Sequence, residues 1–149
     1  MDRLITLKEV TDFEEISSIW YALSDTYNPS LIDAISDFDN YVKKISEYGI
    51  TTTAYVDGNL AGASAYYAND FDAREGYITQ FAVCRCYQNS GIARILMEKV
   101  LCDSKKRGMK RVLLRVLKNN VNAIGFYRHL GFNIEPSDID EYFLMYIDI

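Results

Sequence analysis

Residues 87–93, which read Tyr-Gln-Asn-Ser-Gly-Ile-Ala, are the segment of this sequence best suited to chemistry. They follow a run typical of a strand and precede a long helical pattern. The first turn of a helix leaves backbone N–H groups without partners, and the helix dipole favours negative charge there. Gly91 lets the backbone approach a diphosphate, and Ala93 keeps the next inward position small. The segment predicts a site for a phosphate-bearing cofactor; the simpler alternative is an ordinary strand-to-helix turn.

The same segment lacks the side chains of two other kinds of phosphate site. No Lys-Ser or Lys-Thr pair follows Gly91, so the loop cannot supply what a nucleoside triphosphate and its magnesium need. No Gly-x-Gly-x-x-Gly pattern precedes a ribose-binding acid, which disfavours a dinucleotide site. Ile92 is expected to point into the core and anchor the helix.

The elements that must position this loop alternate along the chain without a linker or repeat. Helices are expected at residues 11–26, 31–49, 92–108 and 120–130, and strands at 51–56, 60–68, 76–83, 111–117 and 141–149, with one more short strand near Phe132. The first helix begins with a capping-box pattern at Thr11, and Asp57-Gly58 is a hairpin signal. The order ααβββαβαβ predicts an α/β fold.

Length and composition limit the class of protein. A chain of 149 residues, 49% of them hydrophobic, is long enough for one globular domain over 1–149. No apolar run approaches the ~18 residues of a membrane span, and residues 1–9 do not resemble a signal peptide, so we expect a cytoplasmic protein without a membrane partner. Cys84, Cys86 and Cys102 with a single histidine fit neither a disulfide framework nor a zinc site. We expect free thiols and no metal.

Charge is unevenly distributed along the chain. Residues 85–118 contain 10 basic and 2 acidic residues, whereas the remainder contains 6 basic and 19 acidic ones. This asymmetry suits a protein that binds a polyanion with one part and a cation with another, although a solvated basic helix face is an equally simple interpretation. Nucleic acid is disfavoured as a partner, because the basic segment has no accompanying RNP-like aromatic strand or zinc finger.

Two groups of residues have the order and spacing of known sequence motifs. Phe81-Ala82-Val83 precedes the pattern Arg/Gln-x-x-Gly-x-Gly/Ala, which Gln88, Gly91 and Ala93 fill. The second group comprises Val116, Asn120, Ala123, Phe126, Tyr127, Gly131 and Phe132. They resemble motifs A and B of the GNAT superfamily of acyl-CoA-dependent N-acetyltransferases, and together cover about residues 51–132. The resemblance implies a single GNAT-like domain of the α+β kind, with a mixed central sheet flanked by helices and splayed central strands.

The resemblance also implies a set of residues that bind acetyl-CoA. They are Phe81, Ala82, Val83, Gln88, Asn89, Ser90, Gly91, Ile92, Ala93, Arg94, Asn120 and Tyr127. The backbone of the first three would pair with the pantetheine arm, as in strand addition. Arg85 stands where many members have proline, and its side chain could itself meet a phosphate.

Tyr127 is the catalytic residue that the resemblance implies. A phenol at this position would protonate or hydrogen-bond the coenzyme A sulfur as it leaves; the alternative is a core aromatic residue of the 120–130 helix. Asn120 is expected to cap that helix. His129 is expected at the surface near the helix end, not as a general base.

The general base is the least determined part of the site. An aliphatic amine with a pKa of ~10.4 is charged at neutral pH, so acetylation needs a route for its proton. Many family members carry Glu or Asp on the strand before motif A, but this sequence has Thr79 and Gln80 there. Those two residues could hold a relaying water, or Asp72 or Glu75 in the preceding loop could serve.

The acceptor is predicted from charge and aromatic content. Acidic residues in segments that flank the acceptor cleft of the family favour a small cationic amine: Asp25, Asp33, Asp37, Asp70, Asp72 and Glu75. Tyrosines that could line the cleft are Tyr27, Tyr66, Tyr67, Tyr77, Tyr142 and Tyr146. Protein N-termini and lysines remain open as acceptors, and a non-catalytic acyl-CoA sensor is the main rival interpretation. The closing strand, 141–149, could pair across a homodimer.

Overall fold

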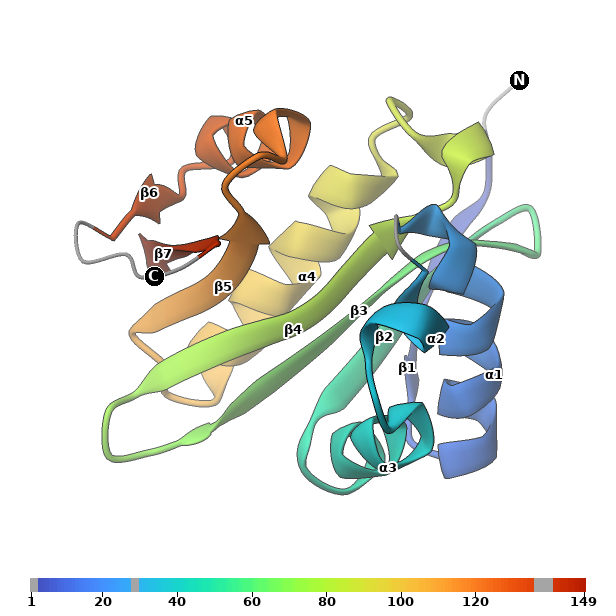
Figure 1. The fold of residues 1–149 in the computed structure, drawn as a ribbon, viewed down its shortest axis with the longest axis horizontal. Coiled ribbons are helices and arrows are strands. Elements are labelled where there is room, and N and C mark those ends of the chain that lie inside the picture. Colours follow the sequence, from blue (N-terminus) through green and yellow to red (C-terminus); the bar gives the residue numbers. More distant parts are fainter. Residues whose placement is uncertain (1–2, 28–29, 136–140) are drawn as a thin grey trace.

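The computed structural model describes residues 3–27, 30–135 and 141–149, and within these one sheet forms the centre of the molecule (Figure 1). Its strands lie in the order β1 (Ile5–Val10), β2 (Ile50–Val56), β3 (Asn59–Asp70), β4 (Glu75–Val83), β5 (Arg111–Leu117), β7 (Tyr142–Asp148) and β6 (Asn133–Ile134). Neighbouring strands are antiparallel except β4 and β5, which run parallel. The sheet is therefore mixed, as predicted.

Helices cover both faces of this sheet (Figure 1). The helical segments are α1 (Phe13–Leu23), η1 (Ser24–Thr26), α2 (Leu31–Ala34), α3 (Phe38–Tyr48), η2 (Arg85–Tyr87), α4 (Ile92–Lys106) and α5 (Val121–His129). Trp20 and Val42 pack with Ala63 in one core cluster, which holds α1–α3 on one face. Met97 and Val100 pack with Leu114 in another, which holds α4 on the opposite face. The fold class expected from the sequence is confirmed.

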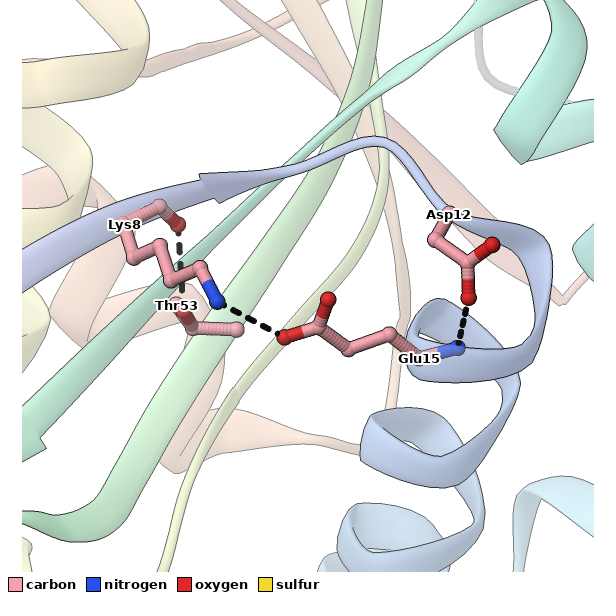
Figure 2. A network of polar contacts seen from close by, with 4 residues as sticks. All are labelled: Lys8, Asp12, Glu15 and Thr53. Atoms are coloured by element: carbon pink, nitrogen blue, oxygen red, sulfur yellow. Dashed lines mark hydrogen bonds and ion pairs between the residues drawn. The ribbon is translucent and has the colours of Figure 1, made fainter.

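The sequence did not predict β1. Lys8 and Glu9 are exposed and only Val10 is buried, so this edge strand has little apolar alternation to reveal it. The Thr53 hydroxyl donates to the Lys8 carbonyl at 3.0 Å, and the Lys8 ammonium pairs with Glu15 of α1 at 2.9 Å (Figure 2). These contacts fasten β1 to both the sheet and the first helix.

The first two predicted helices differ from the expectation in their boundaries. Asp12, not Thr11, caps α1 by accepting the Glu15 N–H at 3.0 Å (Figure 2). The single helix expected over 31–49 was wrong, because the chain is extended at Ile35 and a new helix begins after Asp37. The Asp37 carboxylate accepts the Asn40 N–H at 3.2 Å, so a side-chain cap starts α3. The apolar spacing alone had favoured one continuous helix.

The parallel strands β4 and β5 pair along only part of their length. Their register runs from Glu75 opposite Arg111 to Ile78 opposite Leu114, and stops there. On its other side β4 stays paired with β3, with a register shift that leaves Thr79 as an extra residue. Such a bulge bends a strand, and Figure 1 shows β4 and β5 diverging toward the end where α4 begins. We call residues 79–83, on the side facing β5, the open edge of β4.

The last strand of the chain does not lie at the edge of the sheet. β7 is flanked by β5 and β6, and Asn133 and Ile134 of β6 pair with Tyr146 and Met145. The short strand expected near Phe132 is confirmed as β6, and it covers part of the closing strand on the side away from β5. The edge strands of the described sheet are β1 and β6.

Candidate active site

The segment that opens α4 adopts the conformation of an anion-binding turn. Asn89 and Gly91 have positive φ values of 61° and 88°. Gly91 is the N-cap residue and has no side chain to bond the first N–H groups of α4, and the first helical bond joins the Ile95 N–H to the Gly91 carbonyl. A Cβ built on Gly91 meets nothing within 4 Å, so its left-handed backbone, not crowding within the protein, favours glycine. Ile92 is fully buried, as predicted.

Side chains hold this turn in place from both sides. The Gln88 side-chain amide donates to the Val83 carbonyl at 3.2 Å, and the Ser90 hydroxyl donates to the Tyr87 carbonyl. The Arg3 guanidinium donates to the Ser90 carbonyl at 3.0 Å. Gln88 is thus bonded to β4 and Ser90 to the turn itself. Among the described residues no side chain caps the first N–H groups of α4, which can therefore bind an anion.

A cavity of about 650 Å³ lies between this turn, β4 and α5; we call it the α4–α5 pocket. It is lined by Phe81, Val83, Tyr87, Gln88, Asn89, Gly91, Ala93, Arg94, Asn122, Ala123, Phe126 and Tyr127. The helix start lies at one side and the aromatic face of α5 at the other. The pocket therefore joins a site for negative charge to an apolar wall.

Most of the residues predicted to bind the cofactor line this pocket, and four do not. Ala82 and Ile92 are buried in core clusters, where they position the neighbouring residues. Ser90 contributes its hydrogen bond within the turn. Asn120 accepts the Ala123 N–H at 3.2 Å and so caps α5, as predicted.

Four residues that line the pocket were not among those predicted from the sequence to bind the cofactor. Asn122, Ala123 and Phe126 lie on the same side of α5 as Tyr127, and Tyr87 ends η2. The signal was available for three of them, since Asn122 and Ala123 lie four and three positions before Phe126, and residues at these spacings share a helix face.

Tyr127 lies among aromatic rings at the inner wall of the pocket. Its ring centroid is 5.4 Å from that of Phe126, 5.8 Å from Phe132 and 6.4 Å from Phe81. Within the part of the chain that the structure describes, no hydrogen-bond partner of its hydroxyl is found. Burial raises the pKa of Tyr127 to about 12. The phenol therefore stays protonated at neutral pH and can donate to a ligand atom in the pocket.

Thr79 and Gln80, the two positions of β4 that lack a carboxylate, are bound by a tyrosine of α3. The Tyr41 hydroxyl contacts the Thr79 hydroxyl, accepts from the Gln80 side-chain amide at 3.1 Å, and lies 3.3 Å from the Thr79 carbonyl. Burial raises the pKa of Tyr41, so it too is a neutral hydroxyl. Asp72 and Glu75 lie at the hairpin that begins β4, at the opposite end of the strand from Val83. Neither residue lines the α4–α5 pocket, and their role as bases stays a prediction.

A second tyrosine bonds the backbone of the open edge. The Tyr27 hydroxyl donates to the Phe81 carbonyl at 2.8 Å and accepts from the Phe81 N–H at 3.2 Å. Burial raises the pKa of Tyr27, and the nearby Tyr127 hydroxyl acts in the same direction. Phe81 lines the α4–α5 pocket, whereas Tyr27 packs with the α1–α3 cluster. Tyr27 thus reaches from the opposite face of the sheet to the wall of the pocket.

The predicted acceptor residues divide into two groups. Asp25, Asp33 and Asp37 belong to the α1–α3 side, whereas Asp70, Asp72 and Glu75 belong to the distant hairpin. Among the tyrosines, Tyr27 and Tyr67 pack at the α1–α3 cluster, while Tyr66 is buried in the α4 cluster and donates to Asp103 at 2.6 Å. Tyr66 as a cleft residue was therefore wrong, because β3 turns it to the other face.

The basic segment does not converge on the pocket. Of its charged residues only Arg94 lines the cavity. Arg107 pairs with Asp103 at 2.8 Å, and Arg111 pairs with Asp148 at 2.9 Å. Lys105 and Lys106 lie in the last turn of α4, where positive charge is favourable. Much of the excess positive charge of residues 85–118 therefore lies in ion pairs and at the end of α4, and not at the pocket.

Other expectations about the chain concern metals and membranes. Cys84, Cys86 and Cys102 are free thiols, as predicted. Among residues 3–27, 30–135 and 141–149, no group of three or more His, Cys, Asp or Glu side chains is arranged to hold a metal ion. No helix in these same ranges is long and apolar enough to cross a bilayer.

Comparison with known proteins identifies the family. The model of the acetyltransferase (GNAT) family matches residues 13–132, and the chain belongs to this family. It is 37% identical over 59 residues to the ribosomal protein bS18-alanine N-acetyltransferase of Escherichia coli K12, an alignment that spans 40% of this chain and 40% of that relative.

Solved structures extend the likeness over the whole fold. The E. coli ribosomal-protein-S18-alanine N-acetyltransferase has a TM-score of 0.77 at 19% identity, covering 98% of this chain and 94% of that one. A GNAT family acetyltransferase from Elizabethkingia anophelis with acetyl-CoA bound has a TM-score of 0.75 at 20% identity, covering 97% and 98%. At these identities the likeness establishes the fold alone.

Proposed function

We propose that this protein transfers the acetyl group of acetyl-CoA directly to a primary amine. The observation that carries the proposal is that one cavity contains both the uncapped first turn of α4 and the Tyr127 phenol. A ligand with a diphosphate at one end and a thioester at the other matches these two features. Membership of the GNAT family supports the same reaction.

The residues of the α4–α5 pocket fit coenzyme A. The first N–H groups of α4 would bind the diphosphate, with Gly91 and Asn89 providing the left-handed backbone of the turn. Arg94 adds positive charge at the pocket wall. Asn120 would meet the pantetheine in addition to capping α5. No metal is proposed.

Tyr127 is proposed as the general acid. Acetyl transfer breaks the bond between the acyl carbon and sulfur, and the leaving thiolate needs a proton or a hydrogen bond. Because burial raises the pKa of Tyr127 to about 12, its hydroxyl carries a proton throughout the neutral range. Loss of such a donor typically slows a reaction about 100-fold or more.

Deprotonation of the amine is proposed to use hydroxyl groups and water instead of a carboxylate. The Tyr41 hydroxyl, with Thr79 and Gln80, forms a polar chain beside the open edge of β4. None of these groups can hold the proton at neutral pH. The chain would pass it to solvent on the α1–α3 side, as a proton-conducting path requires.

The proposed acceptor is a small cationic amine. Asp25, Asp33 and Asp37 are exposed on the α1–α3 side and would attract positive charge. A protein N-terminal amine is the second candidate, because the similar E. coli protein is named as an N-acetyltransferase of an alanine in ribosomal protein bS18. A cytoplasmic location and a homodimer also remain proposals.

The experiment that tests the proposal combines binding with turnover. Acetyl-CoA is titrated by calorimetry, and thiol release is then measured with polyamines, aminoglycosides, lysine derivatives and peptides with free N-termini. Micromolar binding with amine-stimulated release is the expected result. Binding without release from any amine would favour an acyl-CoA sensor, and absence of binding would contradict the proposed role of the pocket.

Tyr127→Phe separates an enzyme from a sensor. In the enzyme this variant lowers kcat about 100-fold and changes acetyl-CoA affinity less than about two-fold, because only a hydroxyl that acts in the transition state is lost.

A nucleic-acid binder, the remotest alternative, would instead show salt-dependent retention on DNA.

A further inference from the structure

The open edge of β4 is already occupied in the free protein. The Phe81 N–H and carbonyl both bond the Tyr27 hydroxyl, and the Val83 carbonyl bonds the Gln88 side chain. Unpaired strand edges expose such groups, and here side chains of the same chain satisfy them. A pantetheine arm that pairs with this edge therefore has to compete with contacts that the protein makes by itself.

The competition is strict at Phe81. A backbone N–H donates one hydrogen bond, and the Phe81 N–H already donates to Tyr27 at 3.2 Å. The carbonyl has two lone pairs and can accept from a second donor, whereas the N–H has a single hydrogen, and sharing it between two acceptors weakens both bonds. A ligand carbonyl oxygen that takes the full bond from this N–H therefore displaces the Tyr27 hydroxyl.

Tyr27 also stands between the two faces of the sheet. Its ring packs with the cluster that holds α1–α3, while its hydroxyl reaches Phe81, whose ring contacts Phe126 and Tyr127 across the pocket. The amine is expected from the α1–α3 side and the thioester from the α4–α5 pocket. The hydroxyl lies where the two substrates have to meet.

We propose that Tyr27 is a self-inhibiting contact: its hydroxyl holds the Phe81 peptide group in the free protein, and acyl-CoA displaces it on binding. Displacement frees the Phe81 N–H for a ligand oxygen and opens the connection to the acceptor side. Tyr27 is thus a positioning residue that keeps the two sides of the site apart until acyl-CoA is present. The inference rests on the proposed function.

Calorimetric titration of acetyl-CoA into three proteins tests this inference. Tyr27→Phe removes the competing hydroxyl and should raise the affinity about three- to ten-fold, the equivalent of one net hydrogen bond. Tyr21→Phe is the matched control, since that hydroxyl bonds Asp39 on the exposed surface at 3.0 Å. It should leave the affinity within about two-fold. Unchanged or weaker binding by a folded Tyr27→Phe protein would overturn the inference.

A second measurement follows Tyr27 directly in the wild-type sequence. The protein is labelled with 3-fluorotyrosine, and the fluorine resonance that is missing in Tyr27→Phe is assigned to Tyr27. At saturating acetyl-CoA this resonance should shift and gain a larger solvent isotope shift in D₂O, because the ring leaves a buried site. A Tyr27 resonance that keeps its frequency and its protection would overturn the inference. If wild-type protein does not bind acetyl-CoA at all, it is the proposed function that fails.

Discussion

The two edges of β4 have opposite properties, although they belong to one strand. On the side of β3 the backbones approach so closely that a Cβ on Gly62 would lie 2.7 Å from the Ala82 carbonyl. On the side of β5 the pairing ends at Ile78, and side chains take over the backbone groups that a neighbouring strand would have bonded. One edge is closed by backbone pairing with β3, and the other is the edge at which we propose that a ligand binds.

Because of this difference, residues only a few positions apart should affect either the stability of the fold or ligand binding. Changes at the closed edge should destabilise the protein, because adjacent backbones have no room to adjust. Changes beside the open edge should alter ligand binding with little loss of stability, because that part of β4 faces a cavity. The following variants test how sharply the two properties divide.

Gly62→Ala should have the largest effect on stability. Its added Cβ would meet the Ala82 carbonyl at 2.7 Å and the Val83 Cα at 3.3 Å, so the two strands must separate. We expect a loss of about 3 kcal/mol in the free energy of unfolding, measured by urea denaturation. Gly125→Ala is the control: its Cβ meets nothing within 4 Å on α5, and helix propensity predicts a gain of about 0.5–1 kcal/mol. Equal losses from both variants would contradict the closed edge.

Ala93→Glu should abolish most binding without destabilising the fold. A carboxylate in the first turn of α4 is favourable for the helix dipole, yet at Ala93 it lines the pocket and would repel a diphosphate. Acetyl-CoA affinity should fall roughly 100-fold while the melting temperature stays equal or rises. Ala93→Gln has the same shape without the charge and should lose less affinity. A lowered melting temperature in the glutamate variant would show that this position belongs to the core.

Asn120→Ala should have a smaller effect, and it should lower both the stability of the fold and the affinity for acetyl-CoA. The substitution removes the bond from the Ala123 N–H and should cost about 1 kcal/mol, or roughly 2–4 °C in melting temperature. Asn120→Asp keeps the cap and should restore the stability. Acetyl-CoA affinity that remains low in the aspartate variant would separate a pantetheine contact from the cap, and full recovery would leave Asn120 with the cap alone.

Raising the pH into the alkaline range should lower the stability of the fold by the smallest amount. At neutral pH we expect no such loss. The folded-state pKa values of Tyr67 and Tyr127 are raised to about 12, whereas a tyrosine of the unfolded chain titrates near ~10. Their contribution to stability is complete below pH ~10 and is lost as pH rises toward ~12. Melting temperatures measured across this range should fall, and the fall should be shallower in Tyr67→Phe and Tyr127→Phe. Identical slopes in all three proteins would contradict the burial of these phenols.

The sequence predicted the parts of the site that depend on local patterns. Residues 87–93, the helix after them and the cap at Asn120 follow from turn chemistry and periodicity, which act over a few neighbouring residues. The strand at 111–117 was predicted with its observed bounds. Most of the residues carried over by family resemblance also line one pocket.

The remaining features depend on contacts between distant segments. Tyr27 reaches Phe81, 54 positions later in the chain, and Tyr41 reaches Thr79 and Gln80. No local pattern distinguishes these tyrosines from others that are half-buried. The break before Asp37 was missed for a different reason, since the apolar spacing on both sides is compatible with one continuous helix and the cap decides otherwise.

The short parallel ladder between β4 and β5 is the backbone pairing that joins the two parts of the described sheet, through four residue pairs from Glu75–Arg111 to Ile78–Leu114. Beyond Ile78 the two strands share no backbone pairs, so the sheet constrains their separation least beside the α4–α5 pocket. A covalent cross-link between the diverging ends of β4 and β5 would fix this separation. The change in acetyl-CoA affinity that it causes would then measure how much the separation contributes to binding.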